Sequence, residues 1–200
     1  MLKTLNTLAL FLLTVLTFAQ VSSPILQLNT DMHTGNIKRI SIDASGKYVL
    51  SVSHDKTAKL WDATTGNLLK IFRIPIGLTY EGTLEAGALS PDGKIAAVSG
   101  CTGYEWDKKI SIYLFNTNNG EIFQRLSGLG DFVRDLEFSP DGTYLAAALA
   151  TTGVVIYRKV NSTNFEKHIQ LPHPNDCYNI AFENSCTLIG ENSRSCGQGY

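Results

Sequence analysis

Apolar and polar residues alternate in a series of short runs between residues 37 and 171, and each run ends at a cluster of turn-forming residues. Alternation with a period of two is typical of β-strands that bury one face. The first four runs are Ile37 to Ile42, Tyr48 to Ser53, Ala58 to Asp62 and Asn67 to Ile74. Four strands within about 40 residues, each followed by a turn, predict an antiparallel four-stranded meander.

The same four-strand unit returns twice downstream. Its runs are 84–89, 94–100, 110–116 and 121–126 in the second unit, and 133–138, 144–150, 154–160 and 165–171 in the third. In both later units Ser-Pro-Asp-Gly joins the first two runs, and its glycine accepts the left-handed conformation that this turn needs. The matching glycines Gly46, Gly93 and Gly142 are 47 and 49 residues apart, a period in the range of propeller blades.

We therefore predict an all-β fold, a partial β-propeller of about three to three and a half four-stranded antiparallel blades. The blades are expected at 37–82, 83–128 and 129–172, with an incomplete or degenerate fourth blade at 173–200. In this last part, Asp176 to Phe182 and Cys186 to Gly190 read as its first two strands. Closed rings have about four to eight blades, so we expect a fragment of a longer chain, or else self-association that completes the propeller.

The motifs within these units resemble WD40 repeats. The resemblance rests on DKTAKLWDATTG at residues 55–66 and on SPDGK and SPDGT after hydrophobic runs at residues 90–94 and 139–143. It covers about residues 32 to 172. It implies blades whose strands run in order from the inside of the ring to its outside, and a role in binding proteins.

The resemblance also implies a structural hydrogen-bond network in the first unit, made by His33, Asp55, Trp61 and a serine of the second strand, either Ser51 or Ser53. Such a network has a physical reason. A buried Trp needs an acceptor for its indole N–H, and an imidazole held by a carboxylate ties a turn to the strands beside it.

The later units depart from this motif. Phe115-Asn116 and Tyr157-Arg158 stand where the first unit has Trp61-Asp62, and neither unit has a histidine before its first strand. We expect the network to be absent from both units and their blades to rest on apolar packing alone.

The amino terminus has the pattern of an export signal. Lys3 precedes an uncharged apolar run from Leu8 to Phe18, and small residues at Thr17 and Ala19 fit a cut before Gln20. The alternative, a membrane anchor, is disfavoured because a span takes about 20 apolar residues. We predict a signal peptide at 1–19, a polar leader at 20–36, a periplasmic or extracellular location, and no membrane span after cleavage.

Charge and cysteine content exclude several classes of function. The chain has 17 basic and 18 acidic residues with no basic cluster, which argues against nucleic acid as a partner. Cys101, Cys177, Cys186 and Cys196 form no CxxC pair and no metal-ligand spacing, so we expect no metal or other cofactor. Structural thiols or one opportunistic disulfide remain open. No nucleophile elbow or phosphate-binding glycine loop is present, so we assign no catalytic residues.

Two long loops are the candidate partner-binding surface. Pro75 to Gly82 and Thr102 to Lys109 should emerge on the same side of the blades, and both mix aromatic and charged residues, as interaction hot spots do. The alternative is that these aromatics only stabilise the loops. The candidate binding residues are Tyr80, Glu81, Tyr104, Glu105, Trp106 and Asp107.

The sequence thus predicts a non-catalytic protein-interaction scaffold in an exported protein. One alternative is a regulatory propeller of a secreted enzyme, with a caspase-like peptidase domain beyond residue 200. Another is a periplasmic TolB-like propeller, although the Lys59-Leu60-Trp61-Asp62 ending argues against it. The reading frame after Tyr200 would separate these alternatives.

Overall fold

The computed structural model describes residues 31–103, 109–172, 177–184 and 187–191. Within these ranges the chain forms strands and turns and no helix, so the predicted all-β class is confirmed. It follows that none of the described residues belong to a helix long and apolar enough to cross a membrane. The predicted signal peptide and the leader up to residue 30 lie outside the described residues.

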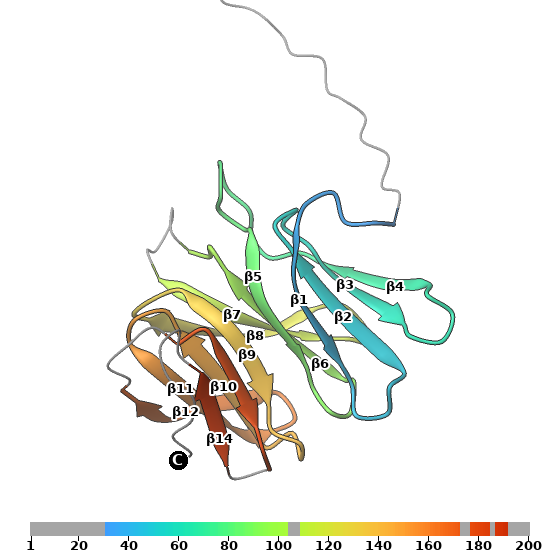
Figure 1. Ribbon diagram of the computed structural model, residues 1–200. Coiled ribbons are helices and arrows are strands. Elements are labelled where there is room, and N and C mark those ends of the chain that lie inside the picture. The colour runs from blue at the N-terminus through green and yellow to red at the C-terminus, as the bar shows by residue number, and fades with distance from the viewer. Residues whose placement is uncertain (1–30, 104–108, 173–176, 185–186, 192–200) are drawn as a thin grey trace, which may run out of the picture. The chain divides into compact units, whose positions relative to one another are not determined.

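Twelve of the strands form three four-stranded antiparallel sheets, each built from consecutive strands, and a two-stranded hairpin follows them (Figure 1). The first sheet comprises β1 (Ile37–Ile42), β2 (Tyr48–Ser53), β3 (Ala58–Asp62) and β4 (Leu68–Phe72). The second comprises β5 (Leu84–Leu89), β6 (Ile95–Gly100), β7 (Ile110–Asn116) and β8 (Ile122–Leu129). The third comprises β9 (Val133–Phe138), β10 (Tyr144–Leu149), β11 (Gly153–Asn161) and β12 (Asn164–Leu171), and the hairpin comprises β13 (Asn179–Phe182) and β14 (Leu188–Glu191).

These sheets are the blades of a partial β-propeller. The first sheet lies within the segment expected for it, whereas the second ends one residue past the expected boundary at 128, at the end of β8. The strands of the hairpin β13–β14 overlap the two strands expected for a fourth blade. The rest of the segment 173–200 lies outside the described residues.

The turns between first and second strands have the predicted chemistry. Gly46, Gly93 and Gly142 have φ angles of 70°, 69° and 71°, which confirms the left-handed position. In the Ser-Pro-Asp-Gly turn, the Ser90 hydroxyl donates to the Asp92 carboxylate at 2.7 Å and accepts from the Ile95 backbone N–H at 2.9 Å. The turn therefore satisfies its own polar groups and fixes where β6 begins.

The first strands of successive sheets contact one another, β1 with β5, β5 with β9, and β9 with β13. One side chain links most of this series. Arg39 on β1 donates to the Asp135 carboxylate at 3.1 Å and to the Asn179 side-chain oxygen at 2.9 Å. Asp135 in turn accepts from the Ile180 backbone N–H at 3.1 Å. The innermost strands are thus joined by polar contacts as well as by packing.

Apolar cores fill the spaces between successive sheets. Leu50, Leu60 and Phe72 of the first sheet pack with Val98 and Phe115 of the second, and the two phenylalanine ring centroids lie 5.1 Å apart. A second core joins the second and third sheets, and a smaller one joins the third sheet to the hairpin.

One close approach in the first of these cores requires a glycine. A Cβ atom at Gly87 on β5 would overlap the side chain of Val52 on β2. Glycine therefore allows the two sheets to meet at this point without displacing the buried Val52 side chain.

The other face of the first sheet is exposed. Ile37, Ile40 and Ile42 on β1 pair with Ser53, Ser51 and Val49 and so point away from the core that joins the first two sheets. Their side chains are 51%, 66% and 57% exposed. Three isoleucines on one strand thus form an apolar surface that the described residues do not bury.

Candidate functional site

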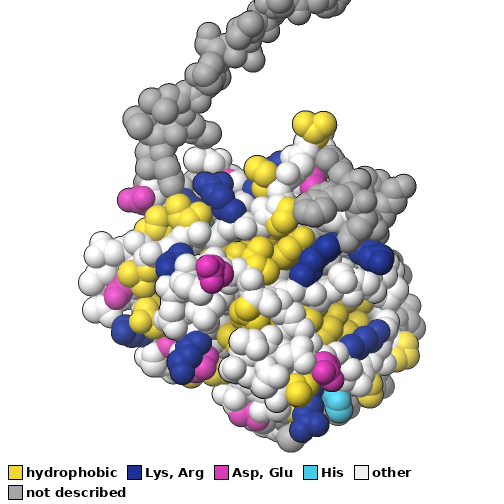
Figure 2. Space-filling model, turned by 180° about the vertical axis from the view of Figure 1, so that it is seen from behind, with side chains coloured by type: hydrophobic (Ala, Val, Ile, Leu, Met, Phe, Trp, Pro, Cys, Tyr) yellow, Lys and Arg dark blue, Asp and Glu magenta, His cyan; other side chains and the backbone are white. Residues whose placement is uncertain are grey.

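The loop between β4 and β5 carries three exposed apolar side chains. Ile76, Leu78 and Tyr80 are 58%, 77% and 76% exposed. The loop projects beyond the ends of the strands in Figure 1, and Figure 2 shows hydrophobic side chains at the tip of that projection. Tyr80, a predicted binding residue, is therefore accessible.

Backbone hydrogen bonds fix the shape of this loop. The Glu81 N–H donates to the Leu78 carbonyl at 3.2 Å, and the Thr83 N–H donates to the Tyr80 carbonyl at 2.9 Å. From outside the loop, the Lys56 ammonium donates to the Gly77 carbonyl at 3.1 Å. The apolar tip is thus presented on a backbone that is already held in place.

Glu81, another predicted binding residue, does not lie on the surface. It is only 2% exposed, and its carboxylate accepts a hydrogen bond from the Gly103 backbone N–H at 2.6 Å. The prediction that Glu81 contacts a partner is therefore wrong. Its physical role is to tie the β4–β5 loop to the start of the β6–β7 loop.

The remaining predicted binding residues, Tyr104, Glu105, Trp106 and Asp107, lie outside the described residues. For them the assignment stays a prediction. Gly103 on one side and Lys109 on the other are described, and the Lys109 N–H donates to the Gly103 carbonyl at 3.2 Å. This bond brings the two ends of the segment together, close to the buried carboxylate of Glu81.

The structure brings together four of the five residues assigned to the hydrogen-bond network. His33 contacts the Asp55 carboxylate through Nδ1 at 2.8 Å and the Ser51 hydroxyl through Nε2 at 2.7 Å. The indole N–H of Trp61 donates to the same hydroxyl at 2.8 Å. Ser53 makes a different contact, in which its hydroxyl accepts from the Asp55 backbone N–H at 3.1 Å.

The serine, histidine and aspartate of this network have the connectivity of a catalytic triad, but the serine is not placed to attack a substrate. Ser51 is only 4% exposed. Its hydroxyl lies within hydrogen-bond distance of His33 Nε2 and accepts from the indole N–H of Trp61. A nucleophile needs an oxygen that a substrate can reach. The arrangement therefore stabilises the blade and offers no route to acyl transfer.

The pKa of Asp55 is lowered in this setting. Burial acts in the opposite direction and would raise it, but hydrogen bonds from Thr57, His33 and the Thr34 backbone outweigh burial. The carboxylate thus stays ionised and remains an acceptor down to low pH.

The second sheet contains a polar cluster of its own. The Thr102 hydroxyl both donates to the Ser111 carbonyl and accepts from the Ser111 N–H, each at 2.9 Å, and the Ser99 hydroxyl donates to the same carbonyl at 2.9 Å. The Arg125 guanidinium donates to the Ser111 hydroxyl at 3.0 Å. The expectation that this blade rests on apolar packing alone is therefore wrong. Hydroxyl groups outside the expected motif satisfy the buried backbone.

Ile76 and Leu78 were not predicted as binding residues, because the prediction rested on aromatic and charged residues of the loop. A signal was present, since these apolar residues lie between the turn-forming residues Pro75 and Gly82 and outside every alternating run. In the structure Leu78 to Gly82 form a bend and turns, with Thr79 at a φ of 51°. Among the described residues, no group of three or more histidines, cysteines or acidic residues is placed to hold a metal ion. Cys101 and Cys177 are free thiols.

Comparison with known proteins identifies repeats in two parts of the chain. Residues 25–62 and 120–156 match the family model of the WD domain, G-beta repeat, known as WD40. The first match ends on Trp61 and Asp62 at the end of β3, and the second runs from the β7–β8 turn into β11. The matches support the resemblance drawn from the motifs.

Curated relatives are similar over part of their length only. The chain is 27% identical over 129 residues to "Echinoderm microtubule-associated protein-like 1" of Homo sapiens. The aligned residues cover 64% of this chain and 14% of that protein. It is 28% identical over 71 residues to "Ribosome biogenesis protein BOP1 homolog" of Drosophila ananassae, which covers 36% of this chain and 8% of that protein. The chain thus spans a small part of the relatives it matches.

Proposed function

We propose that this chain, two stretches of which match WD40 repeats, is a non-catalytic protein-interaction module whose contact surface is the β4–β5 loop. WD40 repeat proteins are generally scaffolds that mediate contacts between proteins. The buried serine of the His33 network is consistent with a scaffold and offers no reaction centre.

The observation that carries the proposal is the exposure of Ile76, Leu78 and Tyr80 on a loop with a fixed backbone. Exposed apolar residues that stand alone are common, but three on one projecting loop form a patch. Burying a leucine-sized side chain in a partner stabilises a complex by about 1.5–3 kcal/mol. Because the backbone is already ordered, little of that gain is lost to ordering the loop on binding.

Capture of partners by the purified chain tests the proposal. Extract from cells that produce the protein is passed over immobilised wild type, Leu78→Asp and Tyr80→Ala, with Val160→Asp as a control at a position on β11 that is 55% exposed. We expect one set of proteins to be retained by wild type and by the control and lost from both loop variants. Equal retention by all four folded proteins would contradict the assignment of the loop.

The proposal extends to location. The apolar run from Leu8 to Phe18 and the small residues before Gln20 support export, after which the module would meet its partners outside the cytoplasm. Amino-terminal sequencing of the protein from its native source tests this. A chain that begins at Gln20 is the expected result, and an intact amino terminus beginning at Met1 would oppose it.

A further inference from the structure

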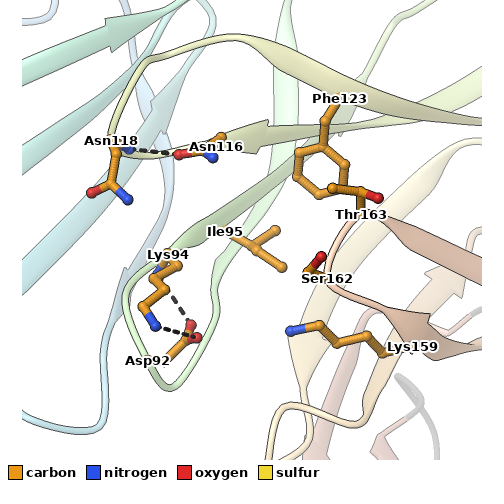
Figure 3. A pocket seen from close by; sticks show the side chains of 9 residues that line it. All are labelled: Asp92, Lys94, Ile95, Asn116, Asn118, Phe123, Lys159, Ser162 and Thr163. Atoms are coloured by element: carbon orange, nitrogen blue, oxygen red, sulfur yellow. Dashed lines mark hydrogen bonds and ion pairs between the residues drawn. The ribbon is translucent and has the colours of Figure 1, made fainter.

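A hollow lies on the described surface, away from the β4–β5 loop. It has a volume of about 350 Å³ and lies where the β5–β6, β7–β8 and β11–β12 turns converge, between the second and third sheets (Figure 3). It is lined by Asp92, Lys94, Ile95, Asn116, Asn118, Phe123, Lys159, Ser162 and Thr163. Its size suits one or two amino-acid side chains of a bound peptide.

Hydrogen bonds hold the walls of this pocket in place. Gln124 on β8 donates to the Phe165 carbonyl and accepts from the Phe165 N–H, both at 2.8 Å, which pins the second sheet to the third beside the pocket. The Lys70 ammonium of the first sheet donates to the Asn118 carbonyl at 2.6 Å and secures the β7–β8 turn. The pocket is therefore formed before any ligand arrives.

The polar groups that face the pocket are mostly donors. Lys159 reaches into it with its ammonium group, which lies between Asp92 and Ser162 in Figure 3. Among the described residues, this ammonium group makes no hydrogen bond or ion pair, and neither the Asn116 side-chain NH₂ nor the Ser162 hydroxyl has a partner. The charge of Asp92 acts on this ammonium group, but no carboxylate of the described residues is in direct contact with it. A pocket with such an ammonium, an amide donor and a hydroxyl is suited to an oxyanion.

The charge of the lining decides which oxyanion fits. Lys94 and Lys159 carry two positive charges, and Asp92, whose carboxylate lies 3.9 Å from the Lys94 ammonium, carries one negative charge. Burial acts to raise the pKa of Asp92, but hydrogen bonds from Ser90 and the Lys94 backbone, together with the charges of Lys159 and Lys94, outweigh it and lower the pKa. Asp141, on the far side of Lys159, is already hydrogen-bonded to Ser139 and Thr143. A net charge of one favours a singly charged carboxylate over a phosphate dianion, because Asp92 repels the dianion about twice as strongly.

We propose that this pocket binds the side-chain carboxylate of an acidic peptide segment, with Lys159 as the ion-pair partner and Asn116 and Ser162 as hydrogen-bond donors. Ile95 and Phe123 form the apolar part of the lining, where a neighbouring apolar side chain of the peptide packs. None of the pocket's lining residues lie in the β4–β5 loop, so the pocket would be a second contact surface of the proposed module.

Titration of the isotope-labelled chain with three capped tripeptides tests this site by amide NMR. The probes are alanine-glutamate-leucine, alanine-glutamine-leucine and alanine-phosphoserine-leucine. We expect the glutamate peptide to give saturable shifts at the amides of Ile95, Asn116 and Phe123, and the glutamine peptide to bind at least roughly tenfold more weakly. Absence of saturable shifts, or preference for the glutamine or phosphoserine peptide, would overturn the assignment.

Variants separate binding from folding. Lys159→Gln should weaken binding of the glutamate peptide by roughly tenfold or more. Lys167→Gln, on β12 outside the pocket, should leave the affinity for this peptide unchanged. Asp92→Asn keeps a turn-forming side chain but removes the repelling charge, so it should tighten binding by roughly two- to fivefold. A purely structural effect would weaken binding in both pocket variants, and that result would refute the site.

Discussion

At the scale of single residues, Glu137 on β9 has a pKa well above that of an ordinary glutamate. Burial, followed by the charge of neighbouring Asp135, raises its pKa from 4.5 to about 7. Glu137 pairs with Ala146 of β10, on the face that packs against the β13–β14 hairpin. The folded protein therefore holds a carboxylic acid in its neutral form at mildly acidic pH.

The raised pKa of Glu137 predicts how the free energy of unfolding depends on pH. Between pH 4.5 and about 7 the folded state keeps a proton on Glu137 that the unfolded chain has released, so the free energy of unfolding should fall as pH rises through that window. Glu137→Gln should flatten this dependence and be more stable than wild type at pH 8. Urea unfolding at several pH values measures both effects. Parallel pH profiles for the two proteins would contradict the prediction.

Single residues also differ in how far their positions could be predicted from the sequence. His33, Asp55 and Trp61 could be assigned to one network because the Leu-Trp-Asp motif has a known physical purpose. Glu81 could not be placed, because its burial depends on an N–H from Gly103, which the β5–β6 pairing brings beside it. A charged residue in a loop looks exposed until its partner, distant in sequence, is known.

At the scale of elements, strands were predictable because their cause is local. Period-two alternation and the Ser-Pro-Asp-Gly turn each depend on a few consecutive residues. The observed strands begin and end close to where these patterns predict. The pocket was not predictable, because its lining comes from three turns of two sheets. Neither was the polar cluster of Thr102 and Ser111, which uses hydroxyls that no motif marks.

The link between two loops gives a prediction at this scale. Glu81→Ala leaves the Gly103 N–H without its carboxylate acceptor, so the free energy of unfolding should fall by about 1–3 kcal/mol. Glu81→Gln keeps an acceptor oxygen and should cost less. Hydrogen exchange at the Gly103 amide should accelerate in the alanine variant and much less in the glutamine variant. Unchanged exchange in both variants would show that this bond does not hold the loops together.

At the scale of the whole molecule, the exposed face of β1 is an apolar surface that no other described part of the chain covers. Ile37, Ile40 and Ile42 lie on the face opposite to the core between the first two sheets. On the other described strands, exposed large apolar side chains occur one to a strand, as Leu69, Ile122, Val160 and Ile169 do. The self-association expected from the sequence remains a proposal, and this face is where it would occur.

Sedimentation velocity tests that proposal. Two copies that meet through β1 would each bury the same isoleucines, so the wild-type sedimentation coefficient should rise with concentration. The double variant Ile40→Glu and Ile42→Glu should stay monomeric and keep its stability, because both positions are already exposed. Ile169→Glu on β12, where the isoleucine is 44% exposed, is the matched control and should associate like wild type. A wild type that is monomeric at every concentration would oppose the idea.

Arg39 has a consequence for the order in which the chain folds. Its partners Asp135 and Asn179 lie 96 and 140 residues later in the sequence. During synthesis each four-stranded sheet can form as soon as it emerges, because its pairings are local, whereas the guanidinium of Arg39 must wait for β9 and β13. Strand β1 is thus secured in part by strands made much later, and a nascent chain halted before Asn179 would have the contact to Asp135 but not the one to Asn179.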